Sequence, residues 1–290
     1  MIRRPPPPAL APYVRCLWYA DDTATRSSGT ATRRERALPT GGMDLVVRLS
    51  DAPIHLYDAL GDEVGTSFGA AVLGGARSSY YVRDTTRPAR SVGVHFRAGG
   101  AAAVLGLPAP TLAERHTPLA DLWGARAAGL RDVLLDAGTP DAALDRLAAA
   151  LPSPRPLHPA VLHALARLSG GNVRVDVVRA ETGYSNRRFI ELFHQAVGLT
   201  PKMYCRVRRF QGALVRLAAG PTPDLTDVAL GAGYCDHPHL NRDFRAFAGI
   251  SPGAYVPQSR DRLNHVPIGP RGSPPAPRSH SSKPAPHRTG

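Results

Sequence analysis

Two stretches of the chain repeat each other: residues 183–201, GYSNRRFIELFHQAVGLTP, and residues 233–252, GYCDHPHLNRDFRAFAGISP. The opening Gly-Tyr recurs after 50 residues, and the closing Gly-apolar-Thr/Ser-Pro recurs at an offset of 51. The first glycine of each copy permits the positive φ that a tight turn between two helices demands. Ser185 or Asp236 then caps a second helix, and a glycine ends it. The pattern predicts two helix-turn-helix units.

Each predicted second helix has an apolar face and a polar face. Phe189 and Phe193 share one side of the first helix, and Leu240 and Phe244 share one side of the second. The opposite faces carry side chains that form hydrogen bonds, as major-groove reading requires. A merely solvated face would explain one such helix. Two copies with the same turn chemistry and basic surroundings favour DNA recognition.

A third helix is predicted between the copies, from Pro201 to Ala219, with Gly220 after its end. Its roughly 18 residues at about 1.5 Å each make a rod of roughly 27 Å. A rod of that length could place two recognition helices in successive major grooves, about 34 Å apart, on one face of a duplex. A single chain could then read two half-sites.

These residues resemble the AraC/XylS family of bacterial transcription regulators over about residues 158–256. The matching signatures are Gly183-Tyr-Ser, Phe189-x3-Phe193-x4-Gly198-Leu-Thr-Pro-Lys202, Arg208-Arg-Phe-Gln, Gly233-Tyr234, His239-Leu-x-Arg242-x-Phe-Arg245 and Gly249-Ile-Ser-Pro252. In this family two helix-turn-helix units are joined by a linker helix. The first copy departs from the pattern at Arg179, a site that the family keeps small, and Pro238 removes a backbone donor at the start of the second recognition helix.

The resemblance implies which side chains meet DNA. The expected base contacts are Asn186, Arg187, Ile190 and Glu191 in the first recognition helix, and His237, Pro238, His239, Asn241 and Arg242 in the second. Arginine can pair bidentately with guanine, and glutamate can accept from cytosine N4. The expected phosphate contacts, which position the protein without reading sequence, are Arg188, Arg208, Arg209 and Arg245.

Charge and composition divide the rest of the chain. The 290 residues carry 36 basic and 23 acidic side chains, and residues 160–260 hold 13 and 7 of them. The expected order is an α+β sensor or dimerisation domain over 1–150, a proline-rich hinge over 151–157, an all-α DNA-binding domain over 158–258 and a disordered basic tail over 259–290. In the first domain, strands are predicted at 43–49 and 92–96, and helices at 101–105, 130–135 and 141–151.

The sequence gives weaker support for an enzyme, for a metal-binding protein and for a nonspecific DNA-binding protein. Cys16 lacks the neighbouring histidine or helix start that would activate a thiol, so no enzyme is expected. Cys235, His237 and His239 point apart on a helix, and His55 and His95 lack the clustered ligands of a cupin-type metal centre. We expect no metal and no cofactor. A nonspecific architectural DNA-binding protein is the alternative function, because the tail is basic.

The sequence therefore predicts a cytoplasmic, sequence-specific DNA-binding transcription regulator. Three cysteines far apart favour a reducing compartment, and no stretch is long and apolar enough for a membrane span. Expected partners are double-stranded promoter DNA and RNA polymerase, a small-molecule effector, and a second copy of the chain bound through the N-terminal domain. The operator, the effector, activation as against repression, and the oligomeric state remain open.

Overall fold

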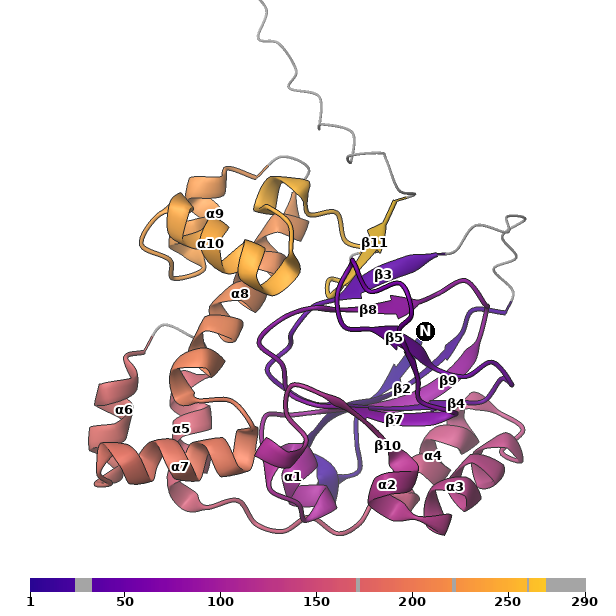
Figure 1. Ribbon diagram of the computed structural model, residues 1–290. Coiled ribbons are helices and arrows are strands. Elements are labelled where there is room, and N and C mark those ends of the chain that lie inside the picture. The colour runs from indigo at the N-terminus through magenta and orange to yellow at the C-terminus, as the bar shows by residue number, and fades with distance from the viewer. Residues whose placement is uncertain (24–32, 171–172, 221–222, 260, 270–290) are drawn as a thin grey trace, which may run out of the picture.

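The computed structural model describes residues 1–23, 33–170, 173–220, 223–259 and 261–269. Figure 1 shows a β-rich N-terminal part and, along one side of it, a helical C-terminal part. One continuous apolar core runs through both parts. The two parts are therefore packed together in this conformation.

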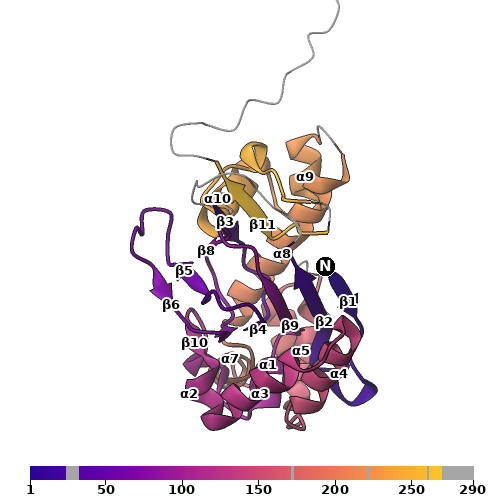
Figure 2. The same cartoon turned by 90° about the vertical axis from the view of Figure 1, so that its right-hand side faces the viewer.

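Two antiparallel sheets form the N-terminal part (Figures 1 and 2). The six-stranded sheet has the order β1 (Ile2–Arg4), β2 (Val14–Asp21), β9 (Arg90–Phe96), β4 (Asp44–Arg48), β7 (Ala71–Gly74) and β10 (His116–Pro118). The five-stranded sheet has the order β11 (His265–Ile268), β3 (Arg34–Ala37), β8 (Tyr81–Asp84), β5 (His55–Tyr57) and β6 (Thr66–Ser67).

Side-chain alternation on β4 explains how the six-stranded sheet is covered. Leu45 and Val47 are buried in the apolar core, whereas Asp44, Val46 and Arg48 line a cavity between the two sheets. Three helices pack under the core face: α2 (Leu119–Trp123), α3 (Ala125–Leu135) and α4 (Pro140–Ala150). A short helix, α1 (Gly100–Leu105), follows β9.

The N-terminal elements predicted from the sequence are present. The predicted strands correspond to β4 and β9, and the predicted helices to α1, α3 and α4. The α+β class is thereby confirmed for this part. The remaining strands of the part were not predicted, since most span only two to four residues and show no clear alternation.

Between residues 159 and 248, the described residues of the C-terminal part form helices and the short segments that join them, without a strand, as predicted. Its helices are α5 (Pro159–Leu168), α6 (Val175–Thr182), α7 (Asn186–Val197), α8 (Pro201–Ala219), α9 (Leu225–Gly231) and α10 (His237–Ala248). Helices α6 and α7 form one pair, α9 and α10 form another, and α8 runs between the pairs (Figure 1).

The prediction of disorder over 259–290 is wrong for residues 261–269. After α10 the chain returns to the N-terminal part, where β11 pairs with β3 in antiparallel register from His265 opposite Ala37 to Ile268 opposite Arg34. Composition misleads here because strand pairing uses backbone hydrogen bonds, which a segment with mostly polar side chains also provides. The single side chain of β11 that is buried is Val266. Residues 270–290 lie outside the described part of the chain.

Helix α8 packs directly on the N-terminal part. A side chain at Gly41 would meet the ring of Tyr204 at 3.4 Å and Val207 at 3.6 Å. The predicted hinge over 151–157 contains neither helix nor strand, and the Arg155 amide donates to the Ala103 carbonyl of α1 at 2.9 Å. In this conformation the segment lies against the N-terminal part, and its role as a hinge stays a prediction.

Candidate DNA-binding surface

Helices α6 and α7 meet in a tight turn. Helix α6 ends at Gly183, which has φ +73°, a left-handed conformation that favours glycine. The Ser185 hydroxyl then accepts a hydrogen bond from the Arg188 amide at 3.3 Å and caps α7. Phe189, Phe193 and other apolar residues of α7 are buried, so its polar face points away from the core.

Helices α9 and α10 repeat this arrangement. Asp224 caps α9, Gly233 in the turn has φ +86°, and the Asp236 carboxylate accepts from the His239 amide at 2.7 Å to cap α10. Leu240 and Phe244 are buried on the inner face of α10. The repeat in the sequence is thus also a repeat in space.

The predicted base contacts divide into two groups by exposure. Exposed side chains are those of Asn186, Arg187, Glu191, Pro238 and Arg242, and half-buried ones those of Ile190, His237, His239 and Asn241. Pro238 lies in the first turn of α10, where a missing backbone donor costs no helical hydrogen bond. The ring of His239 packs edge-on against Tyr234, with 5.1 Å between ring centroids.

The four arginines predicted to contact phosphates differ in their exposure and in the contacts that they already make within the protein. Arg188 and Arg245 are exposed, and Arg188 pairs with Glu191 one turn along the helix at 3.1 Å. Arg208 donates from Nε to the Ser169 carbonyl at 2.9 Å. The guanidinium of Arg209 lies 5.6 Å from the centre of the Tyr234 ring, and its Nε is buried. Of these four side chains, Arg245 is exposed and takes part in none of the contacts just described, so it makes the clearest test of a phosphate contact.

A buried ion pair fixes α10 on α8. The Arg206 guanidinium donates to Asp243 Oδ1 from Nε at 3.2 Å and from Nη2 at 2.6 Å. The Asp243 side chain is 4% exposed, and that of Arg206 is 32% exposed. Phe210 of α8 packs on Phe244 and Phe247 in the same contact. Sequence patterning placed Arg206 on α8 without revealing this partner.

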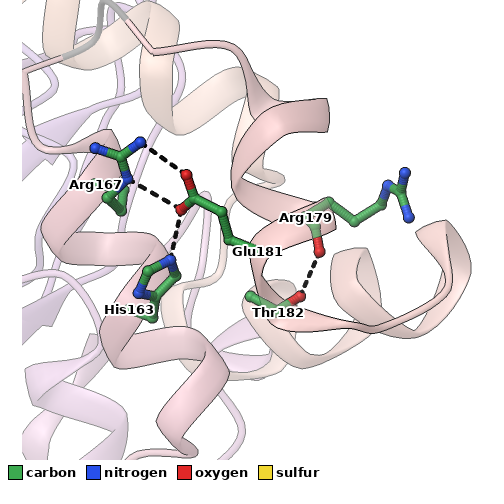
Figure 3. Close-up of polar contacts among 5 residues, drawn as sticks. All are labelled: His163, Arg167, Arg179, Glu181 and Thr182. Atoms are coloured by element: carbon green, nitrogen blue, oxygen red, sulfur yellow. Dashed lines mark hydrogen bonds and ion pairs between the residues drawn. The ribbon is translucent and has the colours of Figure 1, made fainter.

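A second polar contact joins α5 to α6 (Figure 3). The Glu181 carboxylate accepts from Arg167 at 2.7 and 3.0 Å and contacts His163 Nε2 at 2.6 Å. These bonds from Arg167 and His163 hold the pKa of Glu181 at about 2. Arg179, the departure noted in the sequence, points away from this cluster and donates to the Tyr184 carbonyl at 3.1 Å. The large side chain is therefore accommodated at the turn.

A cavity of about 210 Å³ lies between the two sheets of the N-terminal part. Asp44 of β4 is among the residues that line it. The sequence did not reveal most of the residues that line the cavity, because they come from both sheets and from residues 261–265, which are far apart in the chain. The sequence feature that could have indicated the cavity is the strand 44–48, in which alternation places Asp44, Val46 and Arg48 on one face.

No helix in the described part of the chain is long and apolar enough to cross a membrane. Within the same residues, no three histidine, cysteine or acidic side chains are grouped so as to hold a metal ion.

The geometry defines a DNA-binding protein with two helix-turn-helix units. Comparison with known proteins agrees: residues 178–258 match the family "Helix-turn-helix domain" and residues 2–118 match a "Domain of unknown function (DUF6597)". The C-terminal region is an AraC-type helix-turn-helix domain, the class of DNA-binding domain found in transcription regulators. The resemblance seen in the sequence is thereby confirmed.

Two solved structures of ToxT from Vibrio cholerae are similar in outline. One has 9% sequence identity, covers 81% of this chain and 94% of its own, and has a TM-score of 0.44. A ToxT structure with a bound unsaturated fatty acid has 12% identity, covers 82% and 92%, and has a TM-score of 0.42. No curated protein matches the chain.

Proposed function

We propose that this protein is a sequence-specific transcription regulator that inserts α7 and α10 into successive major grooves of promoter DNA. The observation that carries the proposal is the pair of capped helices with outward polar faces, both packed on α8. The 19 residues of α8 span about 28 Å at 1.5 Å per residue, close to one turn of the duplex.

The two kinds of contact predict different mutant behaviour. Arg187 is exposed on the outer face of α7, where its guanidinium can pair with a guanine edge. Arg245 is exposed on α10 and suits a phosphate. Arg187→Ala should cost about 1–3 kcal/mol at one base position and relax the preference there. Arg245→Ala should weaken binding to all sequences and flatten the salt dependence.

The experiment is selection of bound sequences from a random duplex pool with the full chain at near-physiological salt. Recovery of a two-part motif with its parts about one helical turn apart supports the proposal. Recovery of no motif, with binding that collapses as salt rises, supports the architectural alternative instead. If Arg187→Ala and Arg245→Ala behave alike in the same assay, the division into base and phosphate contacts is wrong.

The proposal extends to regulation by the N-terminal domain. The cavity between its sheets is the candidate effector site, and the packing of α8 on this domain provides the route to the DNA-binding units. A non-catalytic role, dimerisation through the N-terminal domain and contact with RNA polymerase belong to the same proposal. Analytical ultracentrifugation with and without operator DNA tests the dimer, and transcription from the selected operator with purified polymerase tests the contact.

A further inference from the structure

The N-terminal part contacts the first recognition helix, α7, at the end where the helix stops. A methyl group added at Gly198, the residue after α7, would lie 3.0 Å from the methyl carbon of Ala113 and 3.4 Å from Met43 Cε. One added at Gly99, just before α1, would lie 3.6 Å from the Ala196 carbonyl of α7. Figure 1 shows α1 beside this end of α7. The C-terminal end of α7 is therefore seated on the N-terminal part.

The second recognition helix, α10, meets a different segment of the N-terminal part. A methyl group added at Gly249, the residue after α10, would lie 2.5 Å from Cε1 of the Tyr80 ring. Tyr80 precedes β8, and the guanidinium of Arg36 on β3 lies 5.6 Å from the centre of its ring. The half-buried ring therefore packs directly against the backbone at the end of α10.

The helix between the two pairs, α8, is held as well. A methyl group added at Gly41 would lie within 3.6 Å of the buried side chains of Tyr204 and Val207. Tyr204 also packs on Phe193 of α7, with 5.6 Å between ring centroids. The N-terminal part thus contacts α8 and the ends of both recognition helices. We call these three contacts, at Gly41, Gly198 and Gly249, the brace.

The brace leaves the DNA-reading ends of both helices exposed. The residues expected to meet bases fall in the first turns, 186–191 in α7 and 237–242 in α10, where Arg187 and Arg242 are exposed. Helix-turn-helix proteins read base edges with these N-terminal residues of the recognition helix. Gly198 and Gly249 lie at the opposite ends. The N-terminal part can therefore stay docked while α7 and α10 enter the grooves.

A third body adds a constraint that α8 alone does not provide. The two helix pairs attach to different parts of α8, the first near Tyr204 and the second near Phe210. Helices of this length, about 28 Å, commonly curve, and bending or twisting of α8 would change the separation of α7 and α10. The N-terminal part has a packed interior, which is hardly compressible, and it contacts both ends. It therefore opposes such bending.

We propose that the brace fixes the separation and relative orientation of α7 and α10, with Tyr80 as the positioning residue for α10. On DNA this imposes a strict spacing between the two parts of the operator. One base pair more or less moves one part by about 3.4 Å along the duplex axis and by about 35° around it. Braced helices cannot follow that change without losing contacts in one groove. The statement about operator spacing rests on the proposed function, whereas the brace itself does not.

The brace is tested first without DNA, on the full chain with a nitroxide label on each recognition helix. The labels are attached through Gln195→Cys and Ala246→Cys, two exposed positions outside the expected DNA contacts. Cys16 and Cys235 are replaced by serine, and the remaining cysteine is buried. Pulsed electron paramagnetic resonance then gives the distribution of distances between the labels. We expect a narrow distribution that Tyr80→Ala broadens, and equal widths in the two proteins overturn the proposal.

Three further variants assign the effect to the contact at Gly249, and circular dichroism verifies that each one folds. Tyr80→Phe keeps the ring and should keep the narrow distribution. Tyr19→Ala is the matched control, because it removes a half-buried tyrosine from β2, which packs on α4. Gly249→Ala forces a methyl group against the ring from the other side and should broaden the distribution. If Tyr19→Ala broadens it as much as Tyr80→Ala does, or Gly249→Ala leaves it narrow, the proposal fails.

The consequence for DNA is measured on the selected operator and on versions with one base pair inserted or removed between its two parts. The full chain should bind the altered operators about 10- to 100-fold more weakly, as expected for the loss of about one base contact. Tyr80→Ala should reduce this ratio. A variant that is merely destabilised would weaken binding to all three operators alike, so an unchanged ratio overturns the proposal.

The two experiments separate the brace from the proposed function. A narrow distribution that Tyr80→Ala broadens, with no two-part operator recovered, would overturn the proposed function and leave the brace standing. A two-part operator bound by a full chain whose distribution is already as broad as that of Tyr80→Ala would overturn the brace alone.

Discussion

The ion pair between Arg206 of α8 and Asp243 of α10 allows a prediction about the stability of the second helix-turn-helix unit. Its partners are unequal: the carboxylate is 4% exposed, whereas the guanidinium is 32% exposed. A charge that can reach water after losing its partner is far less costly than one that cannot. Removing Arg206 should therefore destabilise the protein more than neutralising Asp243.

The expected loss of folding stability depends on which charged group remains after each substitution. Arg206→Met keeps an apolar stem on the helix but leaves a buried carboxylate without its cation, at a cost of about 3–5 kcal/mol. Asp243→Asn retains an acceptor and leaves a guanidinium that can turn to solvent, at a cost of about 1.5–3 kcal/mol. The double variant removes both charges, so it should be more stable than Arg206→Met alone.

The assay is urea denaturation of the full chain followed by far-ultraviolet circular dichroism, with operator affinity as a second readout. Arg167→Met and Glu181→Gln form the control pair, because their ion pair joins α5 to α6 at the surface, with side chains 45% and 31% exposed. Both control variants should cost clearly less than Arg206→Met. Equal costs for the two single variants at the buried pair, or a double variant less stable than Arg206→Met, would refute the reasoning.

Three smaller predictions concern a cap, two turns and one carboxylate. Ser185→Ala should cost about 1 kcal/mol in a urea melt, because α7 loses its capping acceptor, and no loss would contradict the cap. Gly183→Ala should cost about 1–2 kcal/mol for its left-handed φ alone. Gly198→Ala should cost more in the same melt, because its new methyl group would also lie 3.0 Å from Ala113; the opposite order would contradict this packing. Burial raises the pKa of Glu35, but its cationic partners outweigh burial and hold the pKa at about 2, below the usual 4.5. The stability contributed by its charge is thus present above about pH 4.5 and lost as the pH falls toward 2. Glu35→Gln should lack this part of the acid transition between pH 2 and 6, and an unchanged transition would count against the pair.

The sequence by itself determined the helical C-terminal part of the protein. Each helix-turn-helix unit is encoded within about twenty residues. A glycine makes the turn, Ser185 or Asp236 caps the following helix, and spaced apolar residues mark its inner face. Because these signals act between residues close in the chain, they can be recognised without knowing the rest of the fold, and their repetition distinguishes them from chance. The choice of DNA-contacting side chains came from the family resemblance, and it stays a prediction.

Only the tertiary structure decided where residues 261–268 lie and what surrounds the cavity. His265 meets Glu35 across 230 positions of sequence, and Gln211 meets the Pro39 carbonyl across 172. Pairing between such distant segments depends on the whole fold placing two strand edges together, and no local pattern states which edge a segment will join. For the same reason the sequence revealed arginines but not which of them share a cavity. Arg48 and Arg262 line the same cavity only because β11 completes the sheet beside β3.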